Sequence, residues 1–154
     1  MKPGNKLKKV PKKRGKKLVM VSGGFDPVHI GHVRMFEEAK KLAKKIKAKL
    51  LVVVNSDAWL IRKKGKNFMS SGDRAEIIRN FRAVDYVWVL ESDENHVVEA
   101  IKKWKPVIFA NGGDRKEEKD IPEAIICKEL GVKMVFNVGE GGKIRSSSEL
   151  LKKY

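Results

Sequence analysis

Apolar runs and amphipathic segments alternate along the chain. Five runs rich in valine, leucine and isoleucine lie at 17–22, 50–57, 85–91, 106–114 and 132–139. Short, continuous apolar runs with many β-branched residues predict buried strands. Between and after them, apolar residues return every three or four positions in segments 32–49, 70–81, 94–104, 121–131 and 146–154. That spacing predicts helices.

Segment 32–49 shows the helical spacing most clearly. Its regularly spaced apolar positions are Val33, Phe36, Ala39, Ala43 and Ile46. Lysines lie on the other face, so the predicted helix packs an apolar stripe against the sheet and exposes its charged face. In segment 70–81, either Ser71 or Asp73 is predicted to cap the start of the helix.

The order of the elements indicates the fold class. Strands that are apolar throughout are covered on both faces, as they are in parallel sheets. Strand and helix alternate from residue 17 onward, which predicts an α/β fold: a Rossmann-like, doubly wound, five-stranded parallel sheet. At 154 residues the chain fits one domain, placed at 17–154.

Polar loops follow four of the predicted strands. They are GGFDPVHIGH (23–32), NSDAWLIRKKGK (55–66), NGGDR (111–115) and GEGGKIRSSS (139–148), after the first, second, fourth and fifth strands. In open α/β sheets, ligands bind outside the carboxyl ends of the strands, near a switch in strand order. We therefore expect these loops to converge on one site.

The positive charge of the chain is unevenly distributed. The net charge is +16, and the first seventeen residues carry nine lysines and arginines and no acid, which leaves +7 for the rest. These residues include few apolar side chains. Their burial cannot offset the entropy cost of ordering the segment, which predicts a disordered basic tail at 1–16. Such a tail is commonly a solvated arm, and weak nucleic-acid binding is the alternative.

Cysteine usage and hydropathy bear on the compartment. Cys127 is the single cysteine, which excludes an internal disulfide and fits a reducing cytoplasm. No run reaches the roughly 18 apolar residues of a membrane span, and the tail lacks the apolar core of a signal peptide. The expectation is a cytoplasmic protein without a membrane span.

The first loop carries the most distinctive chemistry. It places His29 and His32 close to Gly23 and Gly24. Glycines let the backbone approach a ligand closely, and a helix that begins near Gly31 presents N–H groups to an anion. Both histidines can donate hydrogen bonds to a phosphate. A zinc site takes about three or four ligands, and only one further histidine and one cysteine exist, so phosphate is the favoured ligand.

With these residues, the sequence resembles a known family. GGFDPVHIGH is similar to the HxGH signature of the nucleotidylyltransferase superfamily. The basic KG element of NSDAWLIRKKGK, the GDRAEII segment, the NGGDR turn and KIRSSSELL resemble segments of the cytidylyltransferase-like family in the same order. The succession NSD, R-x-K-G, AVD and GGD is most similar to that of heptose 1-phosphate adenylyltransferases.

The resemblance implies a reaction, a metal and a set of residues. A substrate phosphate would attack the α-phosphate of a nucleoside triphosphate, ATP in the first instance, and release pyrophosphate. Mg²⁺ would be bound by phosphate oxygens and water, so no metal ligands are assigned to the protein. The catalytic roles fall on His29, His32 and Lys64. The nucleotide-binding roles fall on Gly23, Gly24, Phe25, Gly112, Asp114, Arg115, Ser146, Ser147 and Ser148, and the acceptor-binding roles on Asp26, Arg62 and Arg74.

Several of these residues also have a purely structural interpretation. Asp114 can stabilise a tight turn instead of binding a ligand. Ser146 and Glu149 form a capping box, which is compatible with a phosphate bound at the same helix start. Arg74 can be an exposed arginine at a helix start, and Lys66 a solvated loop charge. The three tryptophans are predicted to be packing residues.

Other functions stay open at the level of sequence. Gly24 stands where the family often has threonine or cysteine, Arg145 where isoleucine is usual, and the basic tail is uncommon. CTP-dependent transfer to glycerol 3-phosphate or another polyol phosphate is the main alternative. Pantetheine phosphate and nicotinamide mononucleotide are further acceptors, although NSD…RKKG favours the sugar or polyol branch. A basic nucleic-acid-binding protein is the alternative from a different class, and a homodimer is an open expectation.

Overall fold

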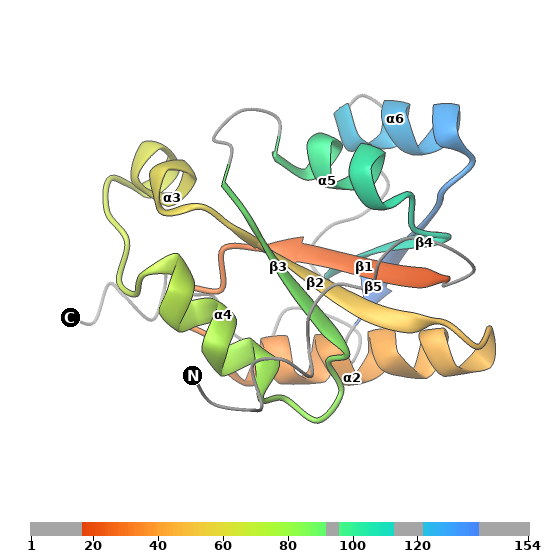
Figure 1. Cartoon of the computed structure of the whole chain (residues 1–154), viewed down its shortest axis with the longest axis horizontal. Coiled ribbons are helices and arrows are strands. Elements are labelled where there is room, and N and C mark those ends of the chain that lie inside the picture. The colour runs from red at the N-terminus through yellow and green to blue at the C-terminus, as the bar shows by residue number, and fades with distance from the viewer. Residues whose placement is uncertain (1–16, 92–95, 113–121, 139–154) are drawn as a thin grey trace.

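The computed structural model describes residues 17–91, 96–112 and 122–138. In this part of the chain, five strands form one parallel sheet in the order β3-β2-β1-β4-β5 (Figure 1). The strands are β1 (Leu18–Gly23), β2 (Lys49–Asn55), β3 (Tyr86–Leu90), β4 (Ile108–Gly112) and β5 (Lys133–Val138). The predicted Rossmann-like α/β fold is confirmed.

Helices cover both faces of the sheet. They are α2 (Ile30–Lys45), α3 (Asp57–Lys64), α4 (Ser71–Arg79), α5 (His96–Trp104) and α6 (Pro122–Leu130). Figure 1 shows α2 and α4 on one face and α5 and α6 on the other. Helix α3 follows the carboxyl end of β2 directly.

The core forms two clusters, one on each face of the sheet. Successive residues of β2 point to opposite faces: Val52 and Val54 pack with α2 and α4, whereas Leu51 and Val53 pack with α5 and α6. All four are fully buried. Burial of each such side chain stabilises the fold by roughly 1.5–3 kcal/mol, so continuous apolar runs are what a sheet covered on both faces requires.

The connections place a switch in strand order beside β1. The chain runs from β1 through α2 to β2 and on to β3, and then returns through α5 to β4 on the other side of β1. The carboxyl ends of β1 and β4 therefore flank the switch point, where open α/β sheets bind their ligands. The loop with His29 and His32 leaves the sheet at this edge.

Two local expectations were wrong. Residues 57–64, interpreted as a polar loop, form helix α3, whose N-cap Ser56 accepts the Trp59 N–H through Oγ at 3.0 Å. Helix α4 is capped by Ser70 rather than Ser71 or Asp73; its Oγ accepts the Asp73 N–H at 3.1 Å. The predicted tail at 1–16 and the helix at 146–154 lie outside the described residues.

Candidate active site

Protein atoms pack tightly around the glycines that end β1. A Cβ on Gly23 would lie 2.9 Å from the ring of Phe25, and a Cβ on Gly24 would lie 2.8 Å from the side chain of Leu60. The Phe25 side chain is buried and its φ is 53°. The space beside these glycines is thus filled by the protein, which leaves only their backbone to meet a ligand.

The two histidines of the loop stack on each other at the start of α2. Their ring centroids are 3.9 Å apart. His29 is the N-cap, and its Nδ1 accepts the Gly31 N–H at 3.1 Å. The Nδ1 of His32 accepts the His29 N–H at 3.2 Å. Because a nitrogen that accepts carries no proton, the proton of each neutral ring is on Nε2. Each ring therefore offers Nε2–H as its donor.

His32 is held in its neutral form. Its pKa is lowered to about 3, mainly by burial of the ring and further by electrostatic interactions with His29 and with the ammonium group of Lys64. Desolvation and neighbouring cations both disfavour the imidazolium. At neutral pH the ring is thus a hydrogen-bond donor without a charge. Lys64 of α3 thus acts electrostatically on the His32 ring.

Phe25 has a supporting position rather than an exposed one. Its ring meets His32 edge-on, with centroids 4.9 Å apart, and Phe36 with centroids 5.3 Å apart. Such edge-to-face pairs contribute about 0.5–1.5 kcal/mol beyond area burial. The side chain supports the His32 ring in its orientation, and its predicted role in binding the nucleotide stays a prediction.

Asp26 clamps a distant loop to the end of β1. Its carboxylate is 1% exposed and accepts the backbone N–H groups of Phe68 and Met69, the latter at 2.7 Å. Hydrogen bonds to a carboxylate are stronger than those between neutral groups. Both oxygens of Asp26 are engaged by backbone, and its predicted role in binding the acceptor stays a prediction.

Arg74 joins four segments of the candidate site. The side chain is fully buried. Its Nε donates to the Met69 carbonyl at 3.0 Å, and its Nη1 donates to the carbonyls of Gly24 at 2.7 Å and Asn55 at 2.8 Å. Its Nη2 donates to the Asp57 carboxylate at 2.7 Å. The interpretation as an exposed arginine is wrong, because the side chain is buried and supplies the donor that carbonyls at the ends of β1 and β2 need. Its predicted role in binding the acceptor stays a prediction.

Helix α3 brings a cluster of cations to the same edge. Arg62, Lys63 and Lys64 form its last turn, where positive charge is favoured by the helix dipole. Lys63 Nζ lies 4.8 Å from the centroid of the Trp59 ring. Arg62 and Lys64 are exposed, so both can reach an anion outside the sheet.

Part of the predicted site lies beyond what the structure describes. Gly112 ends β4 at the switch point. Asp114, Arg115, Ser146, Ser147 and Ser148 lie outside the described residues, so their predicted roles stay predictions. Among the described residues, no group of three or more His, Cys, Asp and Glu side chains could hold a metal ion. No helix in this part of the chain is long and apolar enough to cross a membrane.

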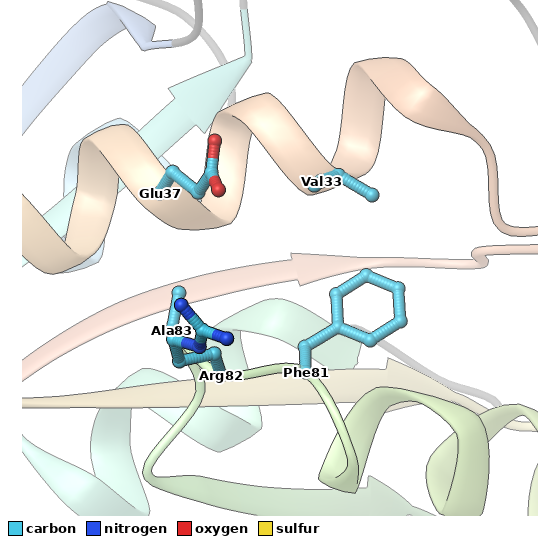
Figure 2. A pocket seen from close by; sticks show the side chains of 5 residues that line it. All are labelled: Val33, Glu37, Phe81, Arg82 and Ala83. Atoms are coloured by element: carbon cyan, nitrogen blue, oxygen red, sulfur yellow. The ribbon is translucent and has the colours of Figure 1, made fainter.

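A separate pocket lies beside α2 (Figure 2). Its volume is about 300 Å³, and it is lined by Val33, Glu37, Phe81, Arg82 and Ala83. None of these residues belongs to the predicted site. Figure 2 shows the pocket between the first two turns of α2, which carry Val33 and Glu37, and the segment that follows α4.

Sequence reasoning missed two residues that organise the site. Asp57 begins α3 and holds Arg74, and Asn55 offers its carbonyl to the same guanidinium. Both lie in the NSD segment at the end of a buried strand. Polar residues in that position are the signal that could have identified them.

Comparison with known proteins identifies related chains. A profile described as Cytidylyltransferase-like matches residues 20–148. A bifunctional protein HldE of a Nitratiruptor species is 41% identical over 120 residues, which are 77% of this chain and 24% of that protein. A bifunctional protein HldE of Wolinella succinogenes is 37% identical over 150 residues, which are 96% of this chain and 29% of that protein. The chain thus spans 24% to 29% of the length of these relatives.

A solved structure shares both fold and sequence with the chain. The lipopolysaccharide core biosynthesis protein from Thermoplasma volcanium is 29% identical, with a TM-score of 0.66. The match covers 82% of this chain and 99% of that one. The likeness therefore extends over nearly the whole of a protein of similar size.

Proposed function

The chain belongs to the cytidylyltransferase-like family of nucleotidyltransferases, and we propose that it joins a nucleotide from ATP to a sugar phosphate with release of pyrophosphate. One observation carries the proposal most directly. Two stacked histidines, whose Nδ1 atoms accept backbone N–H groups, lie at the carboxyl edge of the sheet within the electrostatic range of Lys64. That combination suits the phosphates of a nucleoside triphosphate.

The proposed reaction is a single in-line displacement. An oxygen of the acceptor phosphate attacks the α-phosphorus, the bond from that phosphorus to the bridging oxygen breaks, and pyrophosphate leaves with the bonding electrons. Phosphoryl chemistry of this kind requires positioning and charge stabilisation more than covalent help from the protein. In this proposal the Nε2–H groups of His29 and His32 stabilise the charge that develops on phosphate oxygens.

Neutral histidines fit this role better than charged ones. A ring held neutral by burial keeps one fixed donor across the physiological pH range, and its orientation is set by the Nδ1 bonds and by Phe25. Lys64 supplies the full positive charge from an exposed position, where a flexible ammonium can follow the leaving pyrophosphate.

Mg²⁺ belongs to the proposal as a companion of the triphosphate. When bound, it neutralises charge on the phosphate oxygens, which hold it together with water. The donor set at the described edge consists of imidazoles and cations, and the nearby carboxylates of Asp26 and Asp57 are engaged by backbone N–H groups and by Arg74. This arrangement fits a metal that arrives with the nucleotide.

The acceptor is inferred from the relatives of the chain. They are bifunctional HldE proteins and a lipopolysaccharide core biosynthesis protein, and the NSD…RKKG order resembles that of heptose 1-phosphate adenylyltransferases. Together they support a sugar 1-phosphate. The family description, Cytidylyltransferase-like, supports CTP with glycerol 3-phosphate or another polyol phosphate as the second candidate.

Pyrophosphate release tests this assignment. The chain is incubated with Mg²⁺, with ATP or CTP, and with heptose 1-phosphate, hexose 1-phosphates or glycerol 3-phosphate. We expect turnover with ATP and a sugar 1-phosphate that is lost in His32→Ala and kept in Lys41→Ala, an exposed position elsewhere on α2. CTP dependence would move the protein to the second candidate. Absence of pyrophosphate with every pair would contradict the proposal.

A further inference from the structure

Two buried asparagines at the carboxyl edge of the sheet each have one carboxamide atom without a hydrogen-bond partner. Asn55 ends β2 and Asn111 lies near the end of β4, and each is 6% exposed. Within the described ranges, Oδ1 of Asn55 and Nδ2 of Asn111 are buried and bonded to nothing. An unsatisfied buried polar group costs about 1–3 kcal/mol. Such groups in a folded protein call for a function or a bound molecule as their explanation.

Both side chains lie on the same face of the sheet, on either side of β1. Leu51 and Val53 point toward α5 and α6. Because residues two apart in a strand share a face, Asn55 lies on that face too. Phe109 points to that face, and so does Asn111 two residues further along β4. Neighbouring strands are about 4.8 Å apart, so the two strands that carry the asparagines are separated by roughly 10 Å.

The register places the pair at the switch point. Met20 of β1 is level with Phe109, which puts Asn111 level with Ser22. Gly23 is level with Val54, which puts Asn55 one position beyond the end of β1. The two carboxamides therefore flank the strand end from which the histidine loop departs. The remaining unpartnered atom, Nε1 of Trp104, is at the end of α5, which precedes the amino end of β4 and so lies at the opposite edge.

A strand irregularity lies opposite Asn111, and a hydrogen bond fixes the backbone of Asn55. Between the pairs Ala110–Val135 and Gly112–Val138, β5 has one residue more than β4, so the irregularity falls opposite Asn111. Such bulges are frequent beside active sites, where they redirect side chains. The Asn55 carbonyl is fixed by Arg74 at 2.8 Å. The main chain of Asn55 is thus anchored while its amide oxygen is unpaired.

We propose that Asn55 and Asn111 bind the nucleoside part of the triphosphate and determine which nucleotide the site accepts. This inference rests on the proposed function. With the phosphates at the start of α2, a nucleoside that extends across the switch point reaches the face where the two carboxamides lie. A carboxamide donates and accepts, which suits the hydroxyls of a ribose or the amino group and ring nitrogen of a base.

Leucine substitutions separate this role from a structural one. Leucine has the same branched shape as asparagine and no polar atoms. If the amides bind a ligand, Asn55→Leu and Asn111→Leu keep or raise the melting temperature of the free chain, because an unsatisfied polar group is removed. The exposed Asn80→Leu is the control. Alanine at each position is the second variant, since it fits where leucine does not.

Thermal shift with MgATP and MgCTP alone measures nucleotide binding without an acceptor. We expect at least one of them to raise the melting temperature of the wild-type chain. The affinity for the same nucleotide should be at least about tenfold lower in both asparagine variants, by analogy with lost polar contacts in buried sites. Asn80→Leu should keep the affinity of the wild-type chain. The 2′-deoxy, 3′-deoxy and purine riboside triphosphates then show whether the ribose or the base is the partner. An analogue that lacks the contacted group should bind the variant and the wild-type chain with equal affinity.

Each other outcome overturns the inference in a recognisable way. If no triphosphate stabilises the wild-type chain, the proposed function fails and the inference fails with it. If the wild-type chain binds a nucleotide and the variants bind it equally well, only the inference fails. If leucine and alanine variants both lose stability without ligand and keep their nucleotide affinity, the amides are structural.

Discussion

At the scale of single residues, the two histidines act through one nitrogen each. Their Nδ1 atoms accept backbone N–H groups, which fixes both the rotation of the rings and the position of the proton. This is a helix cap built from imidazoles, in which the capping side chains are also the proposed phosphate donors. The sequence pattern predicted both residues as phosphate donors, and the hydrogen bonds to Nδ1 assign that proposed role to Nε2.

Asparagine and glutamine at position 32 separate the capping role of Nδ1 from the proposed donor role of Nε2. In His32→Asn the side-chain oxygen can replace Nδ1 as the acceptor of the His29 N–H, but no donor replaces Nε2. In His32→Gln the side-chain nitrogen can replace Nε2. We expect kcat to fall by about 10²–10³ in His32→Asn, as for loss of one preorganised donor, and less in His32→Gln. Steady-state kinetics of folded variants measure this, and full activity of His32→Asn would contradict it.

The lowered pKa of His32 makes a prediction about stability and pH. The unfolded ring takes up a proton near pH 6.5, whereas the folded ring does so only near pH 3. Between these values the unfolded chain binds more protons, so the free energy of unfolding decreases as the pH falls through this window. The slope contributed by His32 approaches about 1.4 kcal/mol per pH unit. Urea unfolding between these pH values should show a shallower decline in His32→Asn, and parallel curves would refute the assignment.

The partners of two predicted site residues are backbone atoms. The resemblance to the family assigned acceptor-binding roles to Asp26 and Arg74. The structure engages Asp26 with the amides of Phe68 and Met69, and Arg74 with carbonyls of Gly24 and Asn55. These partners are distant in sequence and carry no side-chain signal, so no local pattern indicates the pairing.

At the scale of elements, Arg74 links the start of α4 to the ends of β1 and β2 and to the start of α3. A single buried guanidinium thus fixes the relative positions of the histidine loop and the helix that carries Lys64. Arg74 is a positioning residue in this account, because its hydrogen bonds go to protein oxygens.

Removing the guanidinium should loosen the whole edge. Arg74→Met leaves the carbonyls of Gly24 and Asn55 without a buried donor, and we expect the free energy of unfolding to fall by about 2–4 kcal/mol. Because the His loop and α3 lose their common support, kcat should fall more than KM rises. Chemical denaturation and kinetics test this, with the exposed Arg34→Met on α2 as the control. A loss within about 0.5 kcal/mol, typical of surface sites, would contradict the role.

The sequence predicted long elements better than short ones. The valine-rich β2 and the regular apolar stripe of α2 are where the pattern placed them. Helix α3 was missed because it has eight residues and only Leu60 is buried, so it lacks the repeated apolar positions that reveal a helix. Its true signals were the N-cap Ser56 and the terminal Gly65, which has a φ of 87°.

At the scale of the whole molecule, the parallel sheet gathers loops that are far apart in sequence. The class of the fold followed from the alternation of strands and helices, but the strand order β3-β2-β1-β4-β5 did not. Strand order depends on which helix covers which face of the sheet. The five apolar runs resemble one another too closely for any one of them to show its place in the sheet. The order matters because it brings Gly24, Asn55 and Asn111 to one switch point.

The basic tail contributes about half of the net positive charge of the chain. The family match begins at residue 20, after the nine positive charges of the first seventeen residues. We expect a chain that lacks residues 2–16 to keep its kcat/KM. Any DNA affinity of the full chain should fall steeply with salt and disappear in the shortened chain. Loss of turnover on deletion would show instead that the tail takes part in the reaction.

The fate of a labelled phosphate tests the central claim most directly. The chain, Mg²⁺ and a sugar 1-phosphate are incubated in parallel with ATP labelled at the α-phosphate or at the γ-phosphate, beside His32→Asn. The account predicts that α-label enters the sugar product and γ-label leaves as pyrophosphate, and that both events are slowed together in the variant. Transfer of γ-label to the sugar, or no transfer of α-label from any nucleoside triphosphate to any phosphorylated acceptor, would contradict nucleotidyl transfer at this site.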